Sequence, residues 1–354
     1  MRAAVRSGTL TRLAVADPRY PFPRDPDVGG AVRAVRVTST DGPSALETTE
    51  IGEPEPAEDQ VLIDVAAAGV NFPDLLLTQG RYQYRPDPPF VLGGEPAGTV
   101  RQAPPDSGFS PGDRVAAMST VGAFAEVVAV APENVFPLPD PVSFVAGACL
   151  PMNYLTMSFA LRLRGGLQSG ETVLVHGAAG GIGTATIQLA GALGARVIAV
   201  VSTPEKAAFV RSVGAHEAVL ADGFKDAVGE LTGGNGVDMV VDPVGGDRFT
   251  DSLRCLAPLG RLLVLGFTAG DIPTVKVNRL LLNNIDVRGV GWGAYAIPRP
   301  GAQRAEWDRV VPLLESGAVD PPVAGTVPLE RAHEAVAALG ERSVLGKFVV
   351  EPAG

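Results

Sequence analysis

Nine residues, VHGAAGGIG (Val175–Gly183), constrain the fold of this chain more than any other stretch. They follow the short apolar run TVLV and precede a segment with helical spacing, and Gly177, Gly180 and Gly183 stand three residues apart. Backbone N–H groups in such a turn, together with the N-terminus of the following helix, can point at a diphosphate. A tight turn without a ligand is the alternative. The succession of strand, turn, helix and next strand favours a dinucleotide-binding turn.

Strands and helices alternate after this turn. Short apolar or β-branched runs are separated by segments with helical periodicity, as in parallel βαβ units. Such units predict an α/β fold with a doubly wound parallel sheet, covered by helices on both faces, over residues 157–292. The expected strands are TVLVHG, ARVIAVVS, EAVLAD, GVDMVVDPVGG and RLLVLGF, and the expected helices are IGTATIQLAGALG, EKAAFVRSVGA, DAVGELTGG and FTDSLRCLAPLG.

The segments on either side predict a second domain. Short alternating runs split by Pro and Gly, such as QVLIDVAAAGV and AEVVAV, indicate a mainly β region before residue 136, and helical spacing with a break at Pro151 follows. The helical segments VVPLLESGAV and RAHEAVAAL and the strand GKFVVE most simply return to that first domain. We therefore expect a poorly ordered N-terminal extension at 1–31, one domain made of 32–156 and 293–354, and the nucleotide-binding domain at 157–292.

Charge and cysteine content argue against several functions. A formal net charge of −10 without a basic stripe disfavours nucleic acid and anionic membranes as partners. The two cysteines, Cys149 and Cys255, leave no disulfide framework and fit a reducing, cytoplasmic compartment. Three widely separated histidines lack the spacing of metal ligands. Two uncharged stretches, 141–161 and 177–195, have membrane-spanning length, but their Pro, Gly and Ala content favours buried helices and turns.

The end of the second strand indicates which dinucleotide would bind. NAD-preferring folds carry Asp or Glu there, about 20 residues past the glycines, to bind the ribose 2′-hydroxyl. This chain has Ser202, followed by Thr203 and Lys206. A hydroxyl and an ammonium can bind a 2′-phosphate, and no carboxylate at the strand end repels it, so the pattern favours NADPH. The alternative is that Lys206 is a solvated charge on the first turn of a helix, and Glu205 reduces the positive potential.

Seven motifs in order along residues 32–350 point to one family. They are AAAGVNFPDLLLTQGRYQ, PFVLGGEPAG, PGDRV, HGAAGGIG, GVDMVVDPVGG, GRLLVLGF and LGKFVV. In these motifs the chain resembles the quinone oxidoreductase branch, which includes zeta-crystallin, of the zinc-independent medium-chain dehydrogenase/reductase superfamily. The resemblance implies a Rossmann domain, a mainly β GroES-like catalytic domain formed from both chain ends, and a cleft where nicotinamide and substrate meet.

The chain departs from zinc-dependent relatives at the metal ligands. Those relatives bind catalytic zinc through a Cys before the Asn-Phe stretch and a His in a Gly-His-Glu triplet. Here the triplet is Gly93-Gly94-Glu95, no Cys precedes Cys149, and two cysteines cannot form a four-cysteine structural zinc lobe. The cysteine count and the resemblance agree in predicting no metal.

The resemblance also implies the residues of the site. Tyr82 would hydrogen-bond or protonate the acceptor carbonyl, and Asn71 would bind the nicotinamide ribose or the substrate. The alternatives are that Tyr82 only closes the pocket by stacking, that Asn71 caps a turn, and that Tyr84 is the phenol that acts. A Tyr that covers the adenine phosphate in some relatives is missing from VLADGF. The expected cofactor-binding residues are Asn71, Thr156, Gly180, Gly181, Ile182, Gly183, Ser202, Lys206, Val244, Gly266, Phe267, Trp292 and Lys347.

Together these features predict a soluble reductase that transfers a hydride from NADPH to a quinone or to the β-carbon of an α,β-unsaturated carbonyl compound. Aromatic side chains such as Phe72 and Phe267 suit a flat, conjugated acceptor. Two alternatives stay open: an enoyl-thioester or polyketide-type enoyl reductase, and a non-catalytic NADPH-binding protein of the crystallin kind. By analogy with similar proteins, we also expect a homodimer that pairs through residues 262–284.

Overall fold

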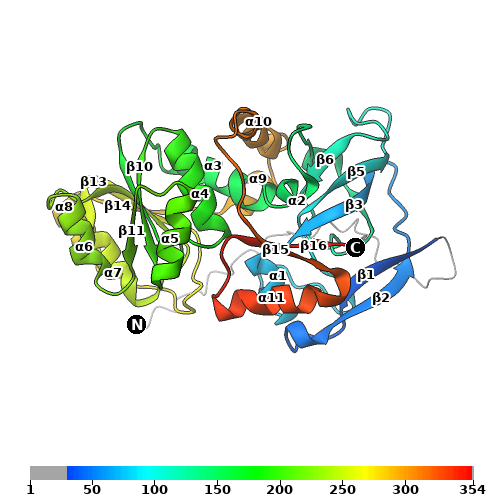
Figure 1. Ribbon diagram of the computed structural model, residues 1–354, viewed down its shortest axis with the longest axis horizontal. Coiled ribbons are helices and arrows are strands. Elements are labelled where there is room, and N and C mark those ends of the chain that lie inside the picture. Colours follow the sequence, from blue (N-terminus) through cyan, green and yellow to red (C-terminus); the bar gives the residue numbers. More distant parts are fainter. Residues whose placement is uncertain (1–29, 353–354) are drawn as a thin grey trace, which may run out of the picture.

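The computed structural model describes residues 30–352, which form two lobes joined by helices (Figure 1). One lobe holds a six-stranded sheet in the order β11-β10-β9-β12-β13-β14, in which every neighbouring pair is parallel. This order confirms the predicted doubly wound sheet, with β9 in the place of the first strand. The strands are β9 (Thr172–Val175), β10 (Arg196–Val201), β11 (Glu217–Leu220), β12 (Val237–Asp242), β13 (Leu256–Val264) and β14 (Asp286–Gly289).

The central strand β9 determines where a ligand can bind on this sheet. Val175 pairs with Ala199 of β10 on one side and with Val241 of β12 on the other. The chain leaves β9 toward β10, and β12 is added on the opposite side, so a crevice opens beyond the carboxyl end of β9. Helices cover the sheet: α4 (Gly181–Ala192), α5 (Pro204–Val213), α6 (Phe224–Leu231), α7 (Phe249–Arg254) and α8 (Asn278–Asn283).

The second lobe is mainly β and combines both ends of the described chain. Its larger sheet has seven strands, six in the order β15-β16-β3-β5-β6-β8, with β7 paired to β3, and its smaller sheet has the order β2-β1-β4. Because β16 pairs with β3, the C-terminal segment completes this lobe, as predicted. The strands are β1 (Ala31–Val37), β2 (Leu46–Gly52), β3 (Val61–Gly69), β4 (Phe90–Val91), β5 (Pro96–Gln102), β6 (Arg114–Ala117), β7 (Val127–Val130), β8 (Val135–Pro137), β15 (Val323–Pro328) and β16 (Lys347–Glu351), and the helices are α1 (Phe72–Thr78), α9 (Trp292–Ala296), α10 (Ala302–Glu315) and α11 (Ala332–Glu341).

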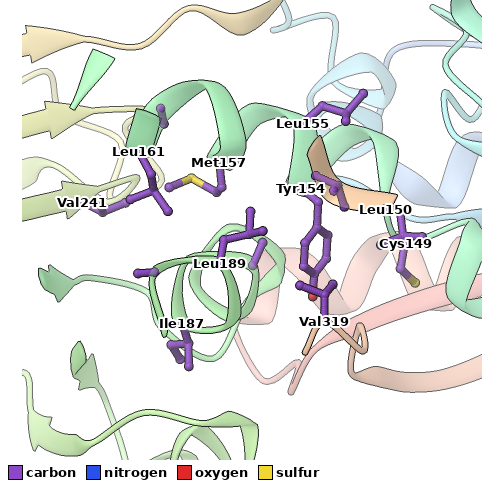
Figure 2. Close-up of a cluster of buried hydrophobic side chains, with 14 of the residues drawn as sticks. Cys149, Leu150, Tyr154, Leu155, Met157, Leu161, Ile187, Leu189, Val241 and Val319 are labelled. Atoms are coloured by element: carbon purple, nitrogen blue, oxygen red, sulfur yellow. The ribbon is translucent and has the colours of Figure 1, made fainter. Parts of the chain in front are cut away.

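An apolar helical segment, Phe144–Arg164, connects the lobes. By length and composition it could cross a membrane, but 72% of its most apolar window is buried inside the protein. Figure 2 shows Met157 and Leu161 of this segment beside Leu189 and Val241 of the α/β lobe. Contact with the protein's own core therefore accounts for its hydropathy. Its parts are α2 (Phe144–Gly147), a π-helical turn η3 (Pro151–Leu155), α3 (Thr156–Phe159) and a second π-helical turn η4 (Ala160–Arg164).

One expected helix is shorter in the structure, and one expected segment lies outside the described residues. The helix predicted for FTDSLRCLAPLG ends at Arg254, because Leu256 already pairs with Val237 and begins β13 ahead of a bulge. Strand β1 begins at Ala31, and the predicted N-terminal extension lies otherwise outside the described residues. The limits at 156/157 and 292/293 stay predictions, since a single buried cluster contains residues of both lobes.

Candidate functional site

The three glycines of the predicted turn differ in whether the fold itself excludes a larger residue. Gly177 has φ of +59°, which favours glycine, and a Cβ on Gly183 would lie 2.4 Å from the Cα of Ala178. Gly180, the N-cap of α4, has an ordinary φ of −90°, and a Cβ there would meet nothing closer than the carbonyl oxygen of Gly177 at 3.6 Å. Gly177 and Gly183 are therefore required by the fold, whereas Gly180 leaves open space at the N-terminus of a helix.

The first turn of α4 suits an anion. The helix has no side-chain cap and no acidic residue in its first turn, so its first N–H groups have no side-chain partner. Ile182, the second residue of α4, is half-buried beside this turn. The turn thus suits a phosphate, because it offers free backbone N–H groups, leaves room at Gly180 and carries no negative charge.

The predicted adenosine-end residues lie together where β10 ends. Thr203 caps α5 and accepts a hydrogen bond from the backbone N–H of Lys206 at 3.2 Å. The ammonium of Lys206 donates to the hydroxyl of Ser202 at 3.3 Å and also to the carbonyl oxygen of Arg342. Ser202 is exposed and Lys206 is half-buried, so a hydroxyl with an ammonium beside it lies at the end of β10. A hydroxyl beside an ammonium can donate hydrogen bonds to a phosphate.

The strand ends on the other side of the crevice bring three predicted residues together. A Cβ on Gly177 would lie 3.3 Å from Val244, which follows β12, so Val244 borders the glycine turn. A Cβ on Gly266 would lie 3.3 Å from the carbonyl oxygen of Pro243, and a Cβ on Gly245 would lie 3.0 Å from the ring of Phe267, which is 37% exposed. These residues follow the carboxyl ends of β12 and β13, on the other side of β9 from Ser202 and Lys206.

A segment of the mainly β lobe runs along the crevice from one end to the other. The guanidinium of Arg342 donates to the carbonyl oxygen of Thr268 at 2.9 Å, next to Phe267. The backbone N–H of Gly346 donates to the carbonyl oxygen of Ala179, in the glycine turn, at 2.8 Å. Through these bonds residues 342–347 link the mainly β lobe to the glycine turn and to the loop that follows β13.

The next residue of that segment belongs to a buried polar cluster. The ammonium of Lys347 donates to Glu95 and, at 2.8 Å, to Oδ1 of Asn71. Asn71 donates from Nδ2 to Oε2 of Glu95 at 2.9 Å and to the carbonyl oxygen of Gly69 at 3.2 Å. Oε1 of Glu95 accepts the backbone N–H of Met152 at 2.7 Å, and Glu95 and Lys347 are 0% and 4% exposed. We call Glu95, Lys347 and Asn71 the buried cluster.

Asn71 is therefore held by protein groups on three sides. It is also the N-cap of α1, and its backbone N–H donates to Asp74 at 2.7 Å. Burial raises the pKa of Asp74 to about 7, against the opposing effects of that hydrogen bond and of Lys347. Asn71 thus stands at the helix N-cap, as the alternative prediction of a capping role expects. The ammonium of Lys347 bonds to groups within the protein.

The candidate phenol Tyr82 packs at the edge of the mainly β core. It is half-buried and contacts the apolar cluster that includes Phe90 and Phe124. Burial, with a smaller contribution from the nearby Asp74 carboxylate, raises its pKa above the ordinary value for tyrosine. Tyr82 is therefore protonated at neutral pH and has a proton to donate.

Two further predicted residues make contacts inside the protein. The hydroxyl of Thr156 donates to the carbonyl oxygen of Met152 at 2.6 Å, on the turn that leads to the crevice. Trp292 is 5% exposed and packs against Phe159 and Tyr295, with ring centroids 5.2 and 6.4 Å apart. Its side chain is part of the core at the base of the lobe interface.

The positions of the zinc ligands in related enzymes carry other chemistry here. Gly94 offers no side chain, and the positive charge beside Glu95 is the Lys347 ammonium. Within residues 30–352, no three His, Cys, Asp or Glu side chains are grouped to hold a metal ion. Cys149 is buried, and burial raises the pKa of its thiol to about 12. This set of donors does not fit a catalytic zinc.

The lobes and the crevice define a class of protein, the two-domain oxidoreductases that combine a GroES-like domain with a nucleotide-binding α/β domain. A family model described as zinc-binding dehydrogenase matches residues 181–316, and one described as alcohol dehydrogenase GroES-like domain matches residues 57–140. The chain belongs to the quinone oxidoreductase branch of the medium-chain dehydrogenase/reductase superfamily.

Three relatives illustrate this membership. Quinone oxidoreductase-like protein 2 of Bos taurus is 36% identical over 295 residues, which are 82% of this chain and 84% of that protein. A probable oxidoreductase from Mycobacterium abscessus is 45% identical with a TM-score of 0.85, covering 91% of this chain and 99% of that one. The mycobacterial protein Rv1454c, solved in complex with NADPH, is 34% identical with a TM-score of 0.83, covering 91% and 100%.

Proposed function

We propose that this oxidoreductase uses NADPH to reduce a quinone or an α,β-unsaturated carbonyl compound without zinc. The observation that carries the proposal is the open, uncapped turn at Gly180, one strand away from the exposed Ser202 and its hydrogen-bonding partner Lys206. The turn suits a diphosphate and the Ser–Lys pair suits a 2′-phosphate. The NADPH complex of the similar mycobacterial protein supports the same choice of cofactor.

When bound, the reduced nicotinamide supplies a hydride, and the residues of this chain orient the reactants and exclude water. Tyr82, protonated at neutral pH, donates a hydrogen bond or a proton to the oxygen on which charge develops. Asn71, held by Lys347 and Glu95, fixes the start of α1 beside that oxygen. Phe267 and Val244 line the crevice where a flat acceptor stacks.

We propose a reaction without zinc because of the residues that stand where zinc-dependent relatives have their metal ligands. Gly94 provides no donor, and an ammonium already neutralises Glu95. A hydrogen bond from a phenol therefore takes the role that a Lewis acid has in zinc-dependent relatives. The expected result is activity that survives dialysis against a chelator.

An acceptor panel tests the proposal. We expect oxidation of NADPH, faster than of NADH, with 1,4-benzoquinone, 9,10-phenanthrenequinone or simple enones. Tyr82→Phe should lower kcat with enones about 100-fold and with quinones less, because quinones accept hydride with little proton assistance. Tyr84→Phe is the matched control and should keep kcat. Turnover confined to enoyl thioesters would favour the enoyl reductase, and nucleotide binding without turnover on any acceptor would favour a non-catalytic binding protein.

A homodimer and a cytoplasmic location complete the proposal. Leu259, Leu281 and Leu282 are 79%, 76% and 73% exposed beside β14, the edge strand of the parallel sheet. Pairing of two such edges buries both the leucines and the open strand. Size-exclusion chromatography with light scattering should give the dimer mass, and a monomer would refute the pairing. The two free, buried cysteines suit a reducing compartment.

A further inference from the structure

One buried side chain at the crevice lacks a hydrogen-bonding partner in the described part of the chain. Asn153 is 7% exposed, and its backbone carbonyl accepts the N–H of Thr156, but its side-chain amide bonds to no described residue. Its amide atoms are not fully enclosed, so they reach the outside of the protein. A polar side chain that is mostly buried and bonded to no protein group is available to a ligand.

The amide of Asn153 lies directly against the first turn of α4. A Cβ on Gly181, the first residue of that helix, would lie 2.4 Å from Nδ2 of Asn153, and the next closest atoms also belong to Asn153. Nδ2 of Asn153 therefore lies beside the first residue of a 12-residue helix whose first N–H groups have no side-chain cap. Gly181 is glycine because the amide occupies the place of its side chain.

The residue before Asn153 is held by two hydrogen bonds. The N–H of Met152 donates to Glu95 of the buried cluster at 2.7 Å, and the carbonyl oxygen of Met152 accepts the hydroxyl of Thr156 at 2.6 Å. Asn153 itself belongs to the π-helical turn η3, a geometry that is frequent at functional sites. The side chain is thus presented from a rigid support that is connected to the mainly β lobe.

We infer that Nδ2 of Asn153 donates a hydrogen bond to the nicotinamide-side phosphate of the bound dinucleotide, next to the N–H groups of α4. The inference rests on the proposed function. The amide carries a donor without a charge, and the helix end already attracts an anion. Its connection to Glu95 places Asn153 at the catalytic end of the crevice, whereas Ser202 and Lys206 serve the adenosine end.

Binding measurements on two ligands test the inference. NADPH contains both phosphates of the bridge, whereas 2′,5′-ADP contains only the one on the adenosine side. For Asn153→Ala we expect a Kd for NADPH about 10-fold higher, and for Asn153→Asp about 100-fold higher because a carboxylate then faces the phosphate. The Kd for 2′,5′-ADP should change less than about 2-fold in Asn153→Ala. Asn235→Ala, on an exposed turn, is the control and should change neither Kd.

A second variant tests the same contact without removing Asn153. Gly181→Ala should displace the amide and raise the Kd for NADPH as Asn153→Ala does, and the double variant should be no weaker than Asn153→Ala alone. An unchanged Kd for NADPH in folded Asn153→Ala, an equal loss for both ligands, or multiplied losses in the double variant would each overturn the inference. A wild-type protein that binds neither ligand would instead overturn the proposed function, and the inference with it.

Discussion

The buried cluster and the glycine turn lie in neighbouring parts of the crevice but satisfy their polar groups in opposite ways. In the cluster, Glu95, Lys347 and Asn71 use one another's hydrogen-bonding groups and are almost completely buried. In the turn, the N-terminus of α4 has no side-chain cap and Gly180 leaves open space. The contrast separates residues that support the site from residues that contact a ligand.

A polar group that is satisfied inside the protein contributes to folding and position, whereas one left open is available to a ligand. Lys347 and Asn71 were predicted as cofactor-binding residues, and the structure gives both of them partners within the protein. Ser202 is exposed at the end of β10, whereas Lys206 is half-buried and donates to the Ser202 hydroxyl and to the carbonyl oxygen of Arg342. Substitutions in the cluster should therefore affect stability first, and substitutions at the turn should affect affinity first.

The largest effect is expected from breaking the buried cluster. Glu95→Ala leaves the ammonium of Lys347 buried without its counter-charge, and the free energy of unfolding should fall by about 3–5 kcal/mol. Glu334→Ala, which breaks the exposed pair with Arg331, should change it far less, because solvent screens that pair. Urea denaturation measures both. Equal, small losses in the two variants would show that the cluster does not stabilise the fold.

The two kinds of glycine give the next test. Gly183→Ala pushes a Cβ to within 2.4 Å of Ala178 backbone, so unfolding should become about 1–3 kcal/mol easier. Gly180→Ala meets no protein atom closer than 3.6 Å, so it should keep the stability and raise the Kd for NADPH about 10-fold. Thermal denaturation measures the stability of both variants, and fluorescence titration measures their Kd for NADPH. If Gly180→Ala were less stable than Gly183→Ala, the proposed difference between the two glycines would be wrong.

A smaller effect is expected at the end of β10. Lys206→Ala removes the ammonium near Ser202, so the Kd for NADPH should rise about 10-fold while the Kd for NADH stays the same. Lys225→Ala, on α6, is the matched control. The assignment of this end to a 2′-phosphate is wrong if both nucleotides lose affinity equally.

The smallest effect concerns Asp74, next to the cluster. Its folded pKa of about 7 lies above the unfolded value of about 4, so between these values the folded state binds the extra proton. The free energy of unfolding then falls as pH rises through this range, by about 1 kcal/mol between pH 6 and pH 7. Asp74→Asn should remove this slope in denaturation curves measured at both pH values. A slope that persists in the variant contradicts the protonation of Asp74.

Local pattern predicted most of the fold. The alternation after TVLV specified the parallel sheet, because β-branched runs and helical spacing report local structure directly. The glycine triplet and the pair Ser202 and Lys206 could be singled out because they are close in sequence and follow predicted strands, and their role in binding a nucleotide stays a prediction. The helix predicted through Gly260 was wrong in its second half, where pairing with β12 overrides helical periodicity.

The partners of the buried cluster could not be predicted in the same way. Glu95 and Lys347 are 252 residues apart, and no local pattern indicates that an ion pair joins them. Asn153 gave no signal either, because its importance lies in the absence of a partner and in its distance to Gly181. Arg342 contacts Thr268 only because the C-terminal segment folds back along the crevice.

Isothermal titration calorimetry with NADPH tests the central claim most directly. The account predicts saturable binding of one NADPH per chain to the metal-free protein, with NADH weaker by about tenfold and with Gly180→Ala weaker than wild type. A folded protein that releases no heat with either nucleotide, or that binds NADPH only after zinc is added, would contradict it.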